Sequence, residues 1–342
     1  VGGATAVTRE VVRYDGSLAQ TEVRTPAVTA ASIDVDGRLD EPVWEDAALL
    51  EGFTQYDPVE GAPASQRTEV YVLVDQDAVY FGVKAYDDSP SEIRATLSER
   101  DSYTFTDDYI RFVLDTFNDQ RRAYVFTVNP FGVQHDGLWN ESGGGTGQRG
   151  RRFGSPIDDA PDFLWWSDAQ VTEWGYQAEI RIPFKSLRFP EQDEQSWGLQ
   201  VERNVQRTGY KSSWSPITGN VANKLTQTGQ LDELRNLDMG LFMELNPVVT
   251  GSRNGELDDL GEFQHDSPEG EFGFNAMYGV TSNLTLDATY NPDFSQVEAD
   301  AGQVQVNERF ALFFPEQRPF FLEGTEIFGM QKQLVYTRTV EN

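Results

Sequence analysis

The feature that most constrains the fold is a series of short segments in which apolar and polar residues alternate. "TEVYVLVD" (68–75) and "AVYFGVKAYD" (78–87) lie on either side of a two-residue turn, and "DYIRFVLDT" (108–116) and "RRAYVFTVNPFG" (121–132) flank another. Alternation with period two puts the apolar side chains on one face of an extended strand. Turns rich in Asn, Asp, Gly and Pro separate the segments. The sequence therefore predicts an all-β fold, an antiparallel β-sandwich.

Two further segments extend this pattern. "AQVTEWGYQAEIRIPF" (169–184) predicts a hairpin that turns at Trp174–Gly175, and "SWGLQVERNVQR" (196–207) predicts another strand. Residues 1–31 show no clear period, and we interpret them as an N-terminal arm. We expect the sandwich itself to span residues 32–236.

The pattern changes in residues 237–342, which contain three alternating segments of about ten residues each, a length that suits membrane-spanning strands as well as long soluble hairpins. They are "MGLFMELNPVVTG", "EFGFNAMYGV" and "NLTLDATYNP". Three or four strands cannot close a membrane barrel, which needs about eight. The sequence thus predicts a partial, barrel-like β-hairpin region, with a barrel that is truncated in this chain.

The stretch "DGRLDEPVWEDA" (36–47) surrounds one tryptophan with five carboxylates. Asp40 is placed to cap a short helix, and Pro42 suits its first turn. Leu39 would then pack on Trp44 as a hydrophobic staple. We expect Trp44 to be buried at one end of the sandwich. The alternative is that the stretch presents the indole ring to a ligand.

Charge and composition exclude several partners. The 342 residues include 56 acidic and 27 basic ones, a formal charge of −29, which repels nucleic-acid phosphates and anionic lipid headgroups. A cationic protein or calcium would be attracted, although solubility alone also explains the charge. There is no cysteine, which excludes disulfides and thiol catalysis. The chain begins at Val1 without a signal peptide, so we expect a processed mature chain.

Catalytic motifs find little support. The two histidines, His135 and His265, are far apart, and no HExxH or GxSxG motif occurs. "GGGTGQRG" lacks the Lys-Ser/Thr of a phosphate-binding loop. We therefore predict a protein without enzymatic activity. A glycoside hydrolase is kept as an alternative, because 56 acids supply many accidental carboxylate pairs.

Two loop clusters could bind ions. Asp87–Asp88 and Asp107–Asp108 stand at expected strand ends, where carboxylates could hold calcium. Their alternative role is that of ordinary turn acids. Arg149, Arg151 and Arg152 lie in the Gly-rich stretch "ESGGGTGQRGRRFGS" and could contact an anion or a carboxylate of a partner. A flexible solvated loop is the alternative there.

Several motifs together resemble a known family. "IDVDGRLDEPVWEDA", "DDYIRFVLDTFNDQRRAYVFTVNPFGVQHDG", "AEIRIPFKSLRFP" and "WGLQVERNV" resemble the family-nine carbohydrate-binding-module-like head of large bacterial envelope proteins. "NPDFSQVEAD" and "RFALFFPEQRPFFLEG" resemble the start of the outer-membrane barrel region in the same proteins. The resemblance implies a β-sandwich head and a periplasmic or cell-envelope location. Members of that family continue for several hundred residues more.

The resemblance also implies where a sugar would bind. Sugar-binding members hold a sugar between two tryptophans, because aromatic faces pack on sugar C–H groups. The candidates we select here are Trp139, Trp166 and Trp214.

The leading functional hypothesis is a non-enzymatic, extracytoplasmic interaction protein. We expect an accessory or structural subunit that docks through protein–protein contacts on a larger membrane or envelope complex. The main alternative is a glycan-binding head of an outer-membrane protein.

Overall fold

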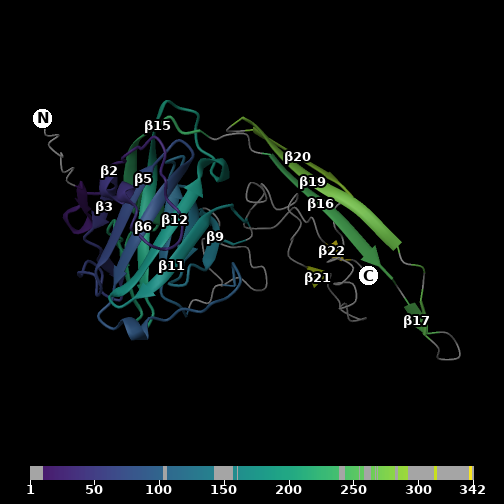
Figure 1. The fold of residues 1–342 in the computed structure, drawn as a ribbon, viewed down its shortest axis with the longest axis horizontal. Coiled ribbons are helices and arrows are strands. Elements are labelled where there is room, and N and C mark those ends of the chain that lie inside the picture. Colours follow the sequence, from purple (N-terminus) through teal and green to yellow (C-terminus); the bar gives the residue numbers. More distant parts are fainter. Residues whose placement is uncertain are drawn as a thin grey trace, which may run out of the picture. The chain divides into compact units, whose positions relative to one another are not determined.

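Two sheets pack face to face in the computed structural model of the chain, as the alternating segments predict (Figure 1). The structure describes residues 11–102, 106–141, 157–159, 161–238, 243–253, 255–257, 263–265, 267, 269–281, 284–291, 312–313 and 339–340. Contacts divide the chain into two units, of which the first comprises residues 1–144 and 155–240. The second comprises residues 145–154 and 241–342, and each unit is described by itself.

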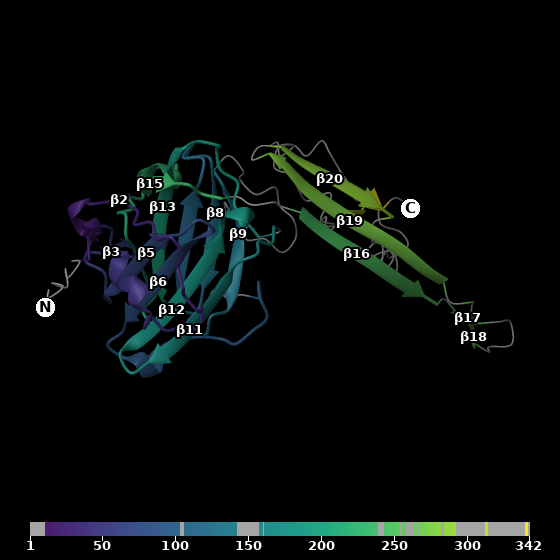
Figure 2. The same cartoon turned by 45° about the horizontal axis from the view of Figure 1, so that its top comes forward.

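The first unit holds both layers of the sandwich. Sheet A has six strands in the order β1 (Arg13–Asp15), β3 (Ala48–Glu51), β5 (Thr68–Val74), β6 (Ala78–Tyr86), β12 (Gly175–Pro183) and β11 (Trp166–Thr172). Sheet B follows the order β10 (Ile157–Asp158), β9 (Gln134–Asn140), β8 (Arg122–Val128), β7 (Tyr109–Asp115), β13 (Glu194–Val205), β14 (Tyr210–Ser213) and β4 (Thr54–Asp57). Two more strands, β15 (Gly229–Arg235) and β2 (Glu22–Arg24), extend sheet B from β13. Figure 2 shows the two layers from a second direction.

Only short 3₁₀ helices interrupt the strands of the first unit among the described residues. They are η1 (Gly16–Leu18), η2 (Pro42–Asp46), η3 (Pro90–Glu92), η4 (Phe184–Ser186) and η5 (Lys224–Gln227). The prediction of an all-β sandwich is therefore confirmed.

The core lies between the two sheets and follows from the alternation. Val70, Val72 and Val74 of β5 face inward, as do alternate residues of β6. Phe81 of β6 meets Phe112 of β7 across the layers, with ring centroids 4.4 Å apart. Both rings are fully buried. Burial of a side chain of this size stabilises the fold by about 1.5–3 kcal/mol.

Part of the segment predicted as an N-terminal arm is paired with both sheets. β1 adds to β3 in parallel at one edge of sheet A, and β2 adds to β15 in parallel in sheet B. Between them, Gly16 lies against Trp214, and a Cβ at Gly16 would stand 1.8 Å from the Trp214 carbonyl oxygen. One short segment thus contributes a strand to each layer.

Trp44 is buried, as predicted, but its place differs from the expectation. It packs with Leu39, Leu73 and Tyr80 in a cluster on the outer face of sheet A. Tyr80 precedes the core residue Phe81 on β6, so its side chain points away from the core. The ring therefore covers the outside of one sheet and does not close the space between the sheets.

The predicted cap of this helix is wrong. The residue before the helix is Glu41, not Asp40, and it makes no side-chain cap hydrogen bond. Glu41 precedes Pro42, and the ring of a proline disfavours helical φ and ψ angles in the residue before it. Its backbone is accordingly extended, with φ −71° and ψ 137°.

Two carboxylates receive the indole N–H of Trp44. The distances are 3.1 Å to Glu179 Oε1 on β12 and 3.2 Å to Glu41 Oε2. Glu179 also accepts the backbone N–H groups of Asp36 and Gly37, each at 3.1 Å. Burial, and then the nearby Glu41 charge, raise the pKa of Glu179 to about 7.

A buried arginine ties the two layers together. Arg203 of β13 donates to the carbonyl oxygen of Arg67 at 2.8 Å, to Thr68 Oγ1 at 3.0 Å and to the Tyr86 carbonyl oxygen at 2.7 Å. The carboxylate of Asp87 lies 3.9 Å away. The Arg203 side chain is fully buried, and these bonds replace most of its water shell, while its Nε has no hydrogen-bond partner among the described residues.

In the second unit, β16 (Met243–Ser252), β19 (Glu269–Thr281) and β20 (Leu284–Tyr290) form an antiparallel sheet. Two smaller pairs are β17 (Gly255–Leu257) with β18 (Phe263–His265), and β21 (Leu312–Phe313) with β22 (Thr339–Val340). Within the described residues, no helix has the length and apolar character needed to cross a membrane.

Replacing Arg203 with methionine should destabilise the first unit by about 3–5 kcal/mol, because it leaves two carbonyl oxygens and the Thr68 hydroxyl without their donor. Chemical denaturation measures the loss. The control is Arg235→Met, which breaks an exposed pair with Glu194 and should cost less than about 1 kcal/mol. Equal losses in the two variants would contradict the role of Arg203.

The pKa of Glu179 predicts a pH dependence of stability. Because this pKa is raised from 4.5 to about 7, the contribution of Glu179 is fully present below about pH 4.5 and is lost as the pH rises through 7. The loss amounts to at most about 3 kcal/mol. The unfolding free energy of the wild type, measured from pH 4.5 to 8, should fall relative to that of Glu179→Gln, because the amide does not titrate. Parallel curves would show that this carboxyl does not titrate in the window.

Candidate functional site

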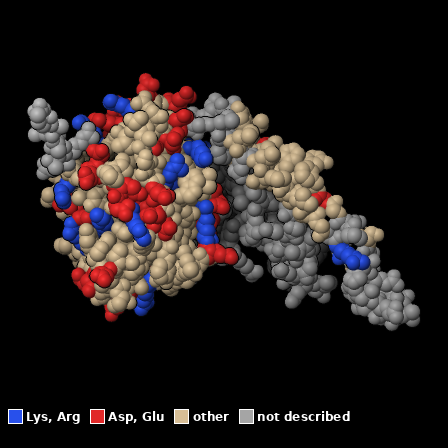
Figure 3. Space-filling model, viewed as in Figure 1, with Lys and Arg blue, Asp and Glu red and all other residues tan. Residues whose placement is uncertain are grey.

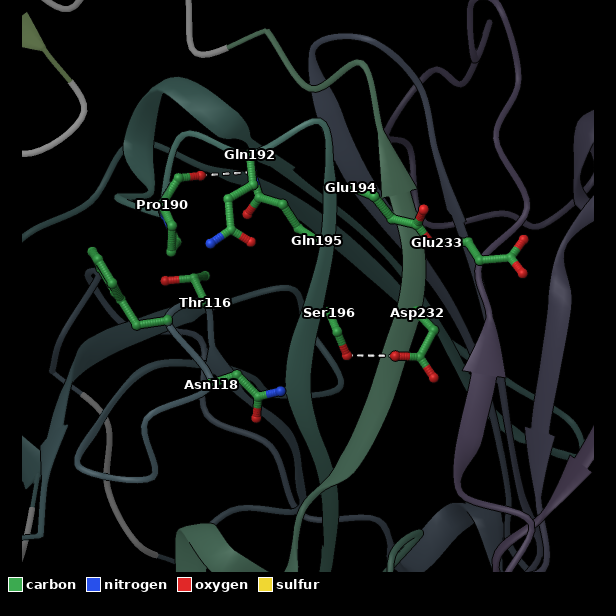
Figure 4. A pocket seen from close by; sticks show the side chains of 10 residues that line it. Thr116, Asn118, Pro190, Gln192, Glu194, Gln195, Ser196, Asp232 and Glu233 are labelled. Atoms are coloured by element: carbon green, nitrogen blue, oxygen red, sulfur yellow. Dashed lines mark hydrogen bonds between the residues drawn. The ribbon is translucent and has the colours of Figure 1, made fainter.

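A cavity of about 520 Å³ opens beside the turn between β7 and β8 (Figure 4). Three parts of the chain that are distant in sequence contribute to it: this turn, the segment that leads into β13, and β15. The lining residues are Thr116, Phe117, Asn118, Pro190, Gln192, Glu194, Gln195, Ser196, Asp232 and Glu233.

The turn between β7 and β8 presents an aromatic ring. Asp115, at the end of β7, accepts the backbone N–H of Gln120 at 2.7 Å and so closes the turn. Burial raises the pKa of Asp115. Asn118 and Gln120 have φ values of 51° and 60°, in the left-handed region that Asn tolerates well. Phe117 directly precedes Asn118 in this turn and is 46% exposed.

A β-bulge shapes the opposite wall. Gln195 pairs with Leu234 and Trp197 with Leu231, so one residue of β13, Ser196, faces two residues of β15. A bulge of this kind bends the strand and redirects its side chains, often next to functional sites.

Those two residues of β15 are Asp232 and Glu233, and the bulge places both in the cavity lining together with Ser196. Glu233 has a φ of 59°, which is uncommon for a residue with a side chain and costs about 1–2 kcal/mol. The wall of the cavity therefore contains a strained backbone conformation at Glu233.

Hydrogen bonds order the polar groups. The amide nitrogen of Asn118 donates to Gln230 Oε1 at 2.9 Å, and Ser196 Oγ lies 3.1 Å from the same oxygen. Ser196 Oγ is also bonded to Asp232 Oδ1, as Figure 4 shows. Gln195 Nε2 donates to the Pro190 carbonyl oxygen at 2.8 Å. The amide and carboxylate groups thus have defined positions before a ligand arrives.

These groups can bind a hydroxyl-rich ligand. Amides, hydroxyls and carboxylates donate to and accept from alcohols, and the exposed face of Phe117 can pack on C–H groups. Ser196 bonds to Asp232 within the lining, whereas His135 lies beside Asp101 and does not line the cavity.

The three tryptophans selected from the sequence fall in different places. Trp214 is fully buried and donates to the Tyr14 carbonyl oxygen at 3.2 Å. Trp139 is buried against Val113 and Leu225 and donates its indole N–H to Glu141 at 2.6 Å. Neither ring has a face open to a ligand, because both fill apolar clusters, and we remove them from the candidate site.

Trp166 is the exception. It lies at the start of β11 and is 40% exposed, with the guanidinium group of Arg181 4.9 Å from its ring centre. It does not line the cavity. The structure therefore does not bring the three tryptophans together into the paired arrangement that the resemblance implies.

The four aspartates predicted to hold calcium have protein partners. Arg207 Nη1 bonds to both carboxylate oxygens of Asp87 at 2.8 Å. Asp88 accepts from Gln66. Asp107 accepts from Thr96 and Asn129, and Asp108 from the Gln206 N–H. Burial raises the pKa of Asp108 to about 6. Calcium binding at these residues stays a prediction, and Arg149, Arg151 and Arg152 lie outside the described residues.

Another acidic group was not predicted. Single carboxylate oxygens of Asp101, Asp136 and Asp162 lie within 4.8 Å of one another. Arg100 bonds to Asp136 at 2.6 Å and to Asp162 at 2.5 Å, so a guanidinium group already supplies positive charge between them. We assign this group a structural role, that of fixing the loop to β9.

Sequence reasoning missed the cavity. The sequence indicates a turn at residues 117–120, but it does not indicate that the side chain of Phe117 is exposed. The signal that could have found the bulge is the break in alternation at "LDELR" (231–235), where two acids stand together in a strand.

A scan against family models finds one family, described as a domain of unknown function (DUF5916), which matches residues 241–342. The match covers less than half of the chain and lies in the second unit. No curated protein matches the chain.

Solved structures resemble part of the chain. A family 9 carbohydrate-binding module from Caldicellulosiruptor kristjanssonii is similar in its complexes with cellotriose and with glucose, each at 16% identity and a TM-score of 0.42. The alignments cover 61% of this chain and 93% and 95% of the module. A proposed carbohydrate-binding protein from Bacteroides uniformis aligns at 12% identity and a TM-score of 0.47, over 62% of this chain and 98% of that protein. The architecture described above rests on the strand pairing in this chain.

The strain at the bulge can be tested by two pairs of substitutions. Because Glu233 is left-handed, Glu233→Gly should be about 1 kcal/mol more stable than Glu233→Ala in chemical denaturation. The matched control is Glu194, also on the cavity wall but in strand β13, where glycine should be less stable than alanine by about 0.5–1 kcal/mol. The same order at both positions would contradict the bulge geometry.

Proposed function

We propose that the first unit is a non-enzymatic glycan-binding domain whose ligand occupies the cavity beside the β7–β8 turn. The observation that carries the proposal is the lining itself, in which amide, hydroxyl and carboxylate groups face a cavity of about 520 Å³ next to one exposed aromatic ring. Ligand sites of a few hundred cubic ångströms with a few convergent polar groups are the rule for small-molecule binding.

The preorganisation of the polar groups supports the same proposal. Asn118, Ser196 and Gln195 are already hydrogen-bonded within the protein, so binding would not have to immobilise them. The bulge holds Glu233 in a strained left-handed backbone conformation. Strained residues of this kind cluster at functional sites, which supports a binding role for this wall.

The proposal predicts that the Phe117 ring contributes to affinity. Phe117→Ala should weaken the binding of an oligosaccharide by about tenfold, because a stacked aromatic ring contributes roughly 1–1.5 kcal/mol. Isothermal titration with a panel of oligosaccharides of different composition measures the change. The control is Phe131→Ala in the β8–β9 turn, since Phe131 is also 46% exposed and does not line the cavity. Absence of binding by every sugar, or equal weakening by both variants, would refute the proposal.

A second function is favoured by a separate observation in the second unit. Strand register puts Met243, Leu245, Val249, Phe272, Tyr278, Leu286 and Tyr290 on one face of the β16–β19–β20 sheet. These seven side chains are between 42% and 79% exposed. The opposite face carries polar residues such as Asn275 and Thr289, which share a hydrogen bond of 2.7 Å.

We propose that this apolar face docks on a subunit of a larger membrane or envelope complex. Contiguous exposed apolar surface of this kind marks interaction sites. The proposal includes an extracytoplasmic location, which the family resemblance implies.

Docking through the apolar face predicts a difference between the two sides of the sheet. Leu245→Asn should lower co-sedimentation of the protein with detergent-solubilised cell-envelope complexes in a density gradient, because it places a polar group on the exposed apolar face. The control is Thr250→Asn on the opposite face, which should leave sedimentation unchanged. Equal behaviour of the two variants would count against docking through this face.

A further inference from the structure

The charges around the cavity are unequal. Three carboxylates line it, from Glu194, Asp232 and Glu233, and none of its lining residues is basic. Acidic side chains also gather on the face of the first unit that Figure 3 shows, with basic ones between them. A ligand that enters the cavity therefore meets negative potential.

Two of the three carboxylates are neutralised at the rim. Arg235 bonds to Glu194 at 2.8 Å, and Arg24 lies 2.9 Å from Glu233. Both pairs are solvent-exposed. With two of the three lining carboxylates in ion pairs, about one negative charge in the lining is left without a basic partner.

Asp232 holds that charge. Its carboxylate accepts a hydrogen bond from the hydroxyl group of Ser196, and among the described residues no Lys or Arg forms an ion pair with it. A hydroxyl partner fixes the carboxylate in place without cancelling its charge. Figure 4 shows that the other oxygen of Asp232 points away from Ser196. That oxygen is a charged acceptor with a defined position in the lining.

We propose that the ligand of this cavity is a glycan with free amino groups, whose ammonium group pairs with Asp232, and that the site rejects glycans with carboxylate or sulfate groups. The inference rests on the proposed glycan binding and names its substrate class. An ammonium group has three hydrogen-bond donors and no acceptor. It therefore matches the carboxylate and amide oxygens of the lining, which accept hydrogen bonds. An anionic sugar would bring like charge against Asp232.

Isothermal titration tests the charge selection with four oligosaccharides of equal length. They are a glucosamine oligomer with free amines, its N-acetylated form, a neutral glucose oligomer and a uronic acid oligomer. At a pH that keeps the amines protonated, the free-amine oligomer should bind about threefold to tenfold more tightly than its N-acetylated form. The uronic acid oligomer should not bind, and added salt should reduce the preference for the amine.

Three variants assign the preference to one carboxylate. Asp232→Asn should abolish the preference for the free amine. Asp40→Asn removes one exposed charge elsewhere and should keep it. Ser196→Ala removes the hydroxyl partner but leaves the charge, so it should also keep the preference. Thermal unfolding of each variant confirms that it is folded.

The outcomes separate this inference from the function on which it rests. Equal affinity for the free-amine and N-acetylated oligomers, or a preference that survives in Asp232→Asn, overturns the charge selection. If the neutral oligomer still binds in a Phe117-dependent way, glycan binding stands without it. If no oligomer of any class binds, both proposals fail.

Discussion

The packing of two apolar sheet faces against each other is the constraint on which the rest of the first unit depends. Phe81 and Phe112 are in contact where the layers face each other. The register of each neighbouring strand must therefore place its apolar residues on the same inner face. A shift of one residue would turn the apolar side chains of a strand outward. Because the inner faces are committed to this core, ligand-binding groups must come from turns, bulges and outer faces. The cavity beside Phe117 obeys that rule.

Buried charge holds the layers and their coverings in place. Arg203 bridges from sheet B to backbone oxygens of sheet A, and Glu179 holds the segment with Trp44 on the outside of sheet A. Each charged group is hydrogen-bonded several times, as a buried ion must be. A scaffold fixed in this way can support a strained bulge at β15, since the strain at Glu233 is small compared with the core.

Strands with strong alternation were predictable, and features built from distant segments were not. β5 and β6 follow the sequence pattern directly, and the burial of Trp44 was predicted as well, although the cap expected at Asp40 is wrong. Its position outside sheet A did not follow, because nothing local tells which face a short helix covers. β1 and β2 have three residues each, too few to show a period. The cavity joins three regions separated by up to about 120 residues, so only the fold could reveal it.

The central claim is that the first unit binds a glycan between Phe117 and the wall formed by the β13–β15 bulge. Nuclear magnetic resonance of the side-chain amide groups measures this most directly, because Asn118, Gln192 and Gln195 each carry one in the lining. On titration with an oligosaccharide that binds, the account predicts that these three signals shift together and saturate with the bulk affinity. Shifts confined to the indole of Trp166, with the three amides unmoved, would contradict it.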